Sequence, residues 1–224
     1  MTDHSDEGLA DAGSGRSMGH VALHYGEPAE GPLAARLLST IGLVETQMLP
    51  LPGGNFYRFV VEGRHFARGD GIVYLSALPE PQRKLVDAIH AAFAVGTDNE
   101  HDVVKDWREM MTADPEASFH FGFLLESLED LEQIVQALRG DPELKERTNI
   151  VLNRPRPGDS EIDARLDASP VFEGVTRYAY GRAGVQAFIE TDLLKAGQLG
   201  DSMVVELDFV FPDHAQHILS VVEL

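Results

Sequence analysis

A strand, a helix and then further strands are predicted twice along this 224-residue chain, and this repetition constrains the fold more than any other feature. The first copy opens with residues 20–25 (HVALHY) and the second with residues 119–126 (FHFGFLLE); each opening segment carries a histidine among strand-forming residues. Repetition of a whole supersecondary unit indicates a duplicated module. The sequence therefore predicts two tandem βαβββ modules.

The predicted helices have recognisable ends. Pro32 suits the first turn of the first helix, and Gly42 suits its end. In the second copy Ser127 and Asp130 form a capping pattern, and Gly140 ends the helix. The extended segments that follow are 44–51, 56–63 and 71–78 in the first copy, and 175–181, 185–194 and 202–211 in the second.

These elements divide the chain into four predicted regions. Residues 1–17 are small, polar and acidic, which is typical of a disordered leader. Residues 18–78 form the first module and residues 79–117 a helical linker. The second module takes residues 118–224 and contains a Pro- and Arg-rich inserted loop at 140–170, in which we expect Arg154 and Arg156 to be solvent-exposed.

The acidic composition excludes several classes of partner. A formal charge of −19 argues against nucleic acid and against an anionic membrane surface, because both require basic residues. The absence of cysteine removes disulfides and thiolate sites and favours a cytoplasmic location. No apolar run approaches the roughly 20 residues that span a bilayer. We expect an acidic protein whose partner is a small molecule, and the sequence is also compatible with a homodimer.

The predicted strands each have one apolar face. Side chains alternate between the two faces of a strand, so Val21 and Leu23 share the face assigned to the helix, whereas His20 and His24 share the other. The last strand divides in the same way, Val205, Leu207 and Phe209 against Val204, Glu206 and Asp208. The second faces mix histidines, carboxylates, a tyrosine and apolar groups, which is typical of a cup for a small organic ligand.

Two βαβββ modules whose first strands carry these histidines, GHVALHY and FHFGFLL, resemble the vicinal oxygen chelate superfamily. That superfamily includes glyoxalases, fosfomycin-resistance enzymes, extradiol ring-cleaving dioxygenases and metal-free bleomycin-binding proteins. The resemblance covers roughly residues 18–78 and 118–212. It implies an α+β fold in which mixed β-sheets form a cup and the helices lie on the outer face.

The resemblance also implies a metal site. The superfamily takes ligands from the first and last strands of each module, and those positions carry His20 and Tyr74 in the first half and His120 and Glu206 in the second. Tyr74 replaces the carboxylate of glyoxalases, so the implied ligands are His20, His120 and Glu206. Such a set suits a divalent ion, namely iron, manganese, zinc or nickel.

The implied chemistry is bidentate chelation of a small oxygenated organic molecule. The metal would act as a Lewis acid or bring a catecholate and dioxygen together. Tyr74 is a candidate hydrogen-bond donor to a bound oxyanion, and His24 a candidate base. Extradiol-type ring cleavage is favoured slightly over an isomerase reaction of the glyoxalase type.

Two alternatives remain open. The first is a metal-free protein that sequesters a small molecule in the same cup, lined by Tyr74 and Phe188. The second is a catalytically silent relative whose cup is filled by its own side chains. The metal-dependent enzyme requires three ligands to converge, whereas the binding protein requires only an open cup.

Overall fold

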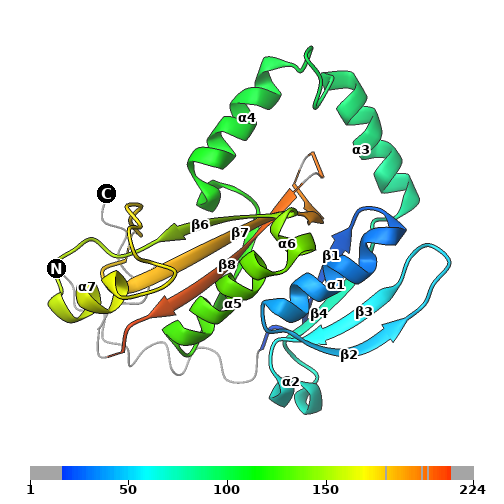
Figure 1. The fold of residues 1–224 in the computed structure, drawn as a ribbon. Helices are drawn as coiled ribbons and strands as arrows, with labels where there is room; N and C mark the ends of the chain where they lie inside the picture. The colour runs from blue at the N-terminus through cyan, green and yellow to red at the C-terminus, as the bar shows by residue number, and fades with distance from the viewer. Residues whose placement is uncertain (1–16, 180, 198, 201, 213–224) are drawn as a thin grey trace, which may run out of the picture.

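A computed structural model describes residues 17–179, 181–197, 199–200 and 202–212, so the predicted leader lies almost wholly outside the described residues. The described chain contains two four-stranded mixed sheets, one in each half (Figure 1). No helix in the described segments is long and apolar enough to cross a membrane.

The first sheet has the strand order β1-β4-β3-β2. Its outer strand β1 runs parallel to β4, and the remaining pairs are antiparallel. Pro32 lies in the first turn of the helix and Gly42 has φ 102°, as the predicted helix ends require. The elements are β1 (His20–Tyr25), α1 (Gly31–Thr40), β2 (Val44–Leu49), β3 (Phe56–Val60), α2 (Gly63–Arg68) and β4 (Ile72–Ala77).

The second sheet repeats this arrangement in the order β5-β8-β7-β6. Again the outer strand β5 is parallel to β8, and the other pairs are antiparallel. The Ser127 hydroxyl accepts the backbone N–H of Asp130, which confirms the predicted cap. The elements are β5 (His120–Leu124), α5 (Leu128–Gly140), α6 (Pro142–Lys145), β6 (Thr148–Asn153), α7 (Ser160–Asp167), β7 (Gly184–Ala196) and β8 (Ser202–Val210). The predicted α+β class with two tandem modules is confirmed.

One predicted strand is wrong. Residues 175–181 were expected to be extended, but the described part of this segment makes a single isolated bridge, between Arg154 and Tyr178. The strand of the sheet is β6, which lies inside the predicted loop 140–170 and pairs with β7 along its whole length. The reason is burial: Ile150 and Leu152 of β6 join the apolar core beneath the sheet. The insertion therefore follows β6, and it contains α7.

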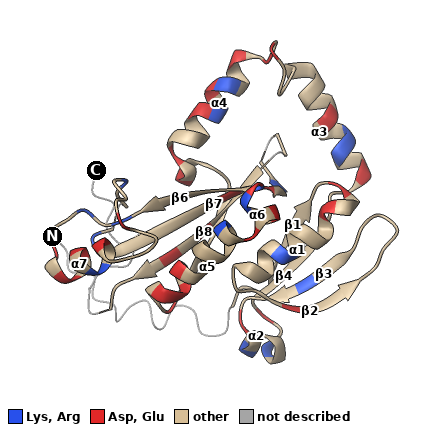
Figure 2. Cartoon of the chain, in the orientation of Figure 1, with Lys and Arg blue, Asp and Glu red and all other residues tan. Residues whose placement is uncertain are grey.

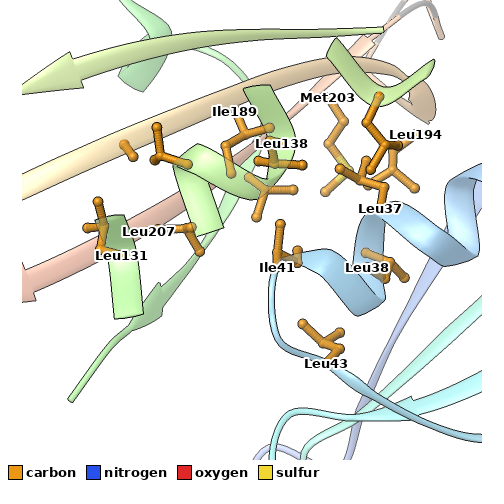
Figure 3. Close-up of a cluster of buried hydrophobic side chains, with 14 of the residues drawn as sticks. Leu37, Leu38, Ile41, Leu43, Leu131, Leu138, Ile189, Leu194, Met203 and Leu207 are labelled. Atoms are coloured by element: carbon orange, nitrogen blue, oxygen red, sulfur yellow. The ribbon is translucent and has the colours of Figure 1, made fainter. Parts of the chain in front are cut away.

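The strand faces follow the predicted alternation. Leu23, Val73, Val185 and Leu207 belong to one continuous core with the apolar sides of α1 and α5. Figure 3 shows where the modules meet: leucines of α1 and α5 lie close to side chains of β7 and β8. The labelled residues there are Leu37, Leu38, Ile41, Leu43, Leu131, Leu138, Ile189, Leu194, Met203 and Leu207. The helices thus cover the apolar faces of the sheets and leave the mixed faces for another role.

A helical arch connects the modules. It consists of α3 (Glu80–Phe93), α4 (Asp102–Ala113) and the short 3-10 helix η3 (Pro115–Ala117), and it projects away from the sheets (Figure 1). No residue of α3 is buried. The His90 ring contacts the Leu199 carbonyl at 2.7 Å, which ties α3 to the turn between β7 and β8. The other end of the arch brings Glu116 to the second sheet.

Candidate functional site

A polar cluster lies on the mixed face of the second sheet. Glu206 and Asp208 come from β8, and they share a face because they are two residues apart. Gln186 of β7 is opposite Asp208, and Gly122 of β5 is opposite Glu206. Gly122 lies directly beside both carboxylates, since a Cβ there would be in van der Waals contact, at 3.6 Å, with an oxygen of each.

Hydrogen bonds join this cluster into a chain across four strands. The Asn153 amide donates to Gln186 Oε1 at 3.1 Å, and Gln186 Nε2 donates to Glu206 Oε1 at 2.6 Å. The other oxygen of Glu206 lies 3.3 Å from His120 Nε2. The His120 ring is turned this way because its Nδ1 lies 2.9 Å from the Ser118 carbonyl. Both oxygens of Glu206 therefore already have partners.

Burial changes the acidity of two neighbouring carboxyls. Desolvation, followed by the negative charge of Glu206 and a hydrogen bond with it, raises the pKa of Asp208 to about 8. Burial and the charges of Glu206 and Asp114 also raise the pKa of Glu116. At neutral pH Asp208 is mostly protonated, and so it can donate a hydrogen bond to Glu206.

Two acceptors in the cluster have no partner among the described residues. They are Oδ1 of Asn153 and Oδ1 of Asp208. Asn153 is only 3% exposed, so water competes poorly for its oxygen. A buried acceptor without a donor is costly, so an additional donor at this oxygen would be stabilising.

A cavity of about 780 Å³ opens beside the cluster. Its volume lies within the range of small-molecule pockets. It lies between η3, the end of β6 and the segment that precedes β7. Its polar and aromatic lining includes Glu116, Asn153, Arg156, Arg177, Tyr178 and Arg182. Asn153 belongs both to the cavity and to the hydrogen-bonded chain, so the two are continuous.

The residues predicted in the first module lie apart from this cluster. The His20 and Tyr74 rings are 5.3 Å apart between centroids, and the Phe56 and Tyr74 rings are 5.4 Å apart. His24 is hydrogen-bonded with Ser76 across the β1–β4 pair, at 3.2 Å from its Oγ. The first sheet thus presents a row of rings where the second presents amides and carboxylates.

The predicted metal ligands are brought together only in part. His120 and Glu206 are adjacent, but His20 does not join them, and no three His, Asp or Glu side chains in the described part of the chain are arranged to hold an ion. The residues present therefore do not fit the implied three-ligand site, and the metal assignment of His20, His120 and Glu206 stays a prediction.

Sequence reasoning missed several residues of the site. Asn153 was missed because β6 was not recognised, and Glu116 because the linker gave no sign of reaching the sheet. Arg154 was expected to be exposed, but it is buried because its guanidinium pairs with Asp167 at 2.7 Å and Asp163 at 3.7 Å. Gln186 lies opposite Asp208 on β7, and strand alternation along β7 was the signal that could have identified it.

The sequence matches no protein-family description and no curated protein. Among solved structures, it is similar to TnmS3, an antibiotic-binding protein from Streptomyces sp. CB03234, with 10% identity and a TM-score of 0.39 over 89% of this chain and 99% of that one. It is also similar to a glyoxalase/bleomycin resistance protein from the same organism, with 10% identity and a TM-score of 0.36 over 85% of this chain and 98% of that one. At such values these likenesses do not bear on activity.

The order and the pairing of the strands are the same in the two modules. Each module has the order βαβββ when the short helices α2, α6 and α7 are set aside, and each sheet places its first strand parallel to its last. Two such modules in tandem are the arrangement that the sequence resemblance to the vicinal oxygen chelate superfamily predicts.

Proposed function

We propose that the chain is a small-molecule binding protein whose ligand occupies the cavity beside Asn153. The observation that carries the proposal is the continuity of an open cavity of about 780 Å³ with a buried polar floor, in which Asn153 Oδ1 has no donor among the described residues. A ligand with a hydrogen-bond donor would satisfy this oxygen and fill the cavity, so both features would stabilise the same complex.

The hydrogen bonds and the burial of Glu206 favour binding without a metal over a metal-dependent dioxygenase or isomerase. Its two oxygens are engaged by Gln186 and His120, and the side chain is 9% exposed. An ion at Glu206 would have to displace one of these buried contacts, and it would lack a ligand from His20. The binding function requires no such rearrangement.

A substitution that fills the cavity with a large side chain tests the proposal. Gly158 lines it, and a Cβ at this position would meet nothing within 4 Å. The Gly158→Trp variant should therefore fold normally and abolish binding of the small-molecule fragments that the wild-type protein selects from a library by ligand-observed NMR. Gly63→Trp is the matched control, because position 63 is also unobstructed and lies on α2 of the first module.

Either of two results would contradict the proposal. Fragments that bind wild type and Gly158→Trp equally, or a wild-type protein that binds none, would remove the cavity as the site. Loss of all binding after treatment with a chelating agent would instead return support to the metal-dependent enzyme.

A further inference from the structure

Arginines gather around the cavity of a strongly acidic chain. Arg156, Arg177 and Arg182 line it, although the chain as a whole carries a formal charge of −19. Figure 2 shows basic residues in the loops near α7, while α7 carries acidic residues and α3 and α4 carry both kinds. These arginines offset the acidic residues of the lining, Asp114, Glu116 and Asp159, so the cavity is less acidic than the chain as a whole and can accept an anion.

Two of these guanidinium groups have no carboxylate partner among the described residues. Arg177 donates one hydrogen bond to the Ala113 carbonyl at 2.9 Å, and its Nε is buried without a partner. Arg156 lies over the ring of Tyr178, with 5.2 Å between the guanidinium carbon and the ring centroid. The neighbouring Arg154, by contrast, is paired with two aspartates.

Two of the acidic residues that line the same cavity cap helices. Asp114 accepts the backbone N–H of Glu116 and thereby caps η3, and Asp159 accepts the N–H groups of Glu161 and Ile162 and caps α7. Burial and the charges of Glu206 and Asp114 raise the pKa of the remaining acid, Glu116. Among the described residues, none of these acids forms an ion pair with Arg156 or Arg177, so both guanidinium groups can pair with an anionic ligand.

We propose that the ligand is a small organic carboxylate, whose anionic group is held by Arg156 and Arg177 and whose hydroxyl or N–H group donates to Asn153 Oδ1. This assignment rests on the proposed binding function and adds the chemical class of the ligand. A guanidinium recognises a carboxylate through paired, charge-assisted hydrogen bonds, and a partly buried site is screened less by water. Asn153 supplies selectivity for a ligand that carries a donor as well as a charge.

The test uses pairs of probes that differ in charge alone. Isothermal titration of the full chain compares a set of aromatic hydroxycarboxylates with the matching carboxamides, beginning with 4-hydroxybenzoate and 4-hydroxybenzamide. We expect the wild-type protein to bind the carboxylates about tenfold more tightly, because a charge-assisted bond is roughly twice as strong as a neutral one. Inorganic phosphate is the third probe and should compete weakly.

Variants then assign the effect to residues. Arg177→Gln and Arg156→Gln should each remove most of the preference for the carboxylate and leave the affinity for the carboxamide within about twofold. Arg156 is exposed, so Arg156→Gln keeps the test valid even if Arg177→Gln is unstable. Arg64→Gln is the control, because Arg64 lies on α2 and pairs with Glu62.

Failure of this inference can be told from failure of the binding function. If neutral fragments bind and Gly158→Trp abolishes their binding, but carboxylates show no preference or phosphate competes as strongly, the ligand class is overturned and the cavity stands. If no fragment binds, or Gly158→Trp has no effect, the function itself fails.

Discussion

The two modules pair their first and last strands in the same register, but aromatic rings occupy the open face of the first sheet and polar side chains that of the second. Ala22 faces Tyr74 across β1 and β4, and Gly122 faces Glu206 across β5 and β8, so Tyr74 and Glu206 occupy equivalent places. The first is a half-buried ring beside other rings, and the second is a buried carboxylate in a hydrogen-bonded chain. The duplicated fold thus places Tyr74 and Glu206 at equivalent points of their sheets. The residues around each point decide whether its side chain stacks with rings or forms hydrogen bonds.

The largest expected effect comes from breaking the polar chain of the second module. Gln186→Leu removes the donor to Glu206 Oε1 and the acceptor of the Asn153 amide, and leaves these two buried groups without each other's bridge. We expect a loss of about 3 kcal/mol in the free energy of unfolding, measured by urea denaturation. Tyr74→Leu in the first module should cost about 1 kcal/mol, since it removes only ring contacts. Equal losses would show that the two faces do not differ as described.

The pH dependence of stability sharpens the same contrast. The pKa of Asp208 is about 8 in the folded chain, above its ordinary value of about 3.9, so the folded state binds this proton more tightly. The contribution of Asp208 to stability should therefore be fully present below about pH 4 and be lost as the pH rises through about 8. One pKa unit is worth about 1.4 kcal/mol; because Asp208 is partly solvated, we expect a discounted loss of about 2 kcal/mol between pH 5 and 8.

Asp208→Asn isolates this contribution, because asparagine keeps a donor to Glu206 but does not titrate. The difference in unfolding free energy between pH 5 and 8 should shrink by about 2 kcal/mol in the variant. A variant with the same slope as the wild-type protein would place the titrating group elsewhere. Ser76→Asn, at the equivalent position of the first module, should leave the slope unchanged.

The smallest effect is expected at His20. It is exposed and lies apart from the cavity, so His20→Ala should change stability by no more than about 0.5 kcal/mol and leave fragment affinity within about twofold. Elemental analysis of both proteins accompanies the measurement. Stoichiometric metal in the wild-type protein that His20→Ala loses would contradict metal-free binding and support the ligand set of His20, His120 and Glu206.

Much of the fold could be predicted from local signals. Pro32, Gly42 and Ser127 act within one turn of a helix, and alternation acts within one strand, so the sequence alone identified both modules and the face that carries His120 and Glu206. The strand β6 was missed because it lies close to a Pro- and Arg-rich stretch and is held in place by β7, which is distant in the sequence.

The tertiary structure decided the site. Whether Glu206 binds a metal or a side-chain amide depends on which residues reach it, and those residues come from β5 and β7 rather than from its own strand. The same holds for Arg154 and Arg156, which are neighbours on one loop: one is buried against aspartates and the other lines the cavity. Side-chain direction along a strand is a local property that the sequence encodes directly. Convergence of side chains from separate strands, and the burial that shifts the pKa of Asp208, arise only from packing.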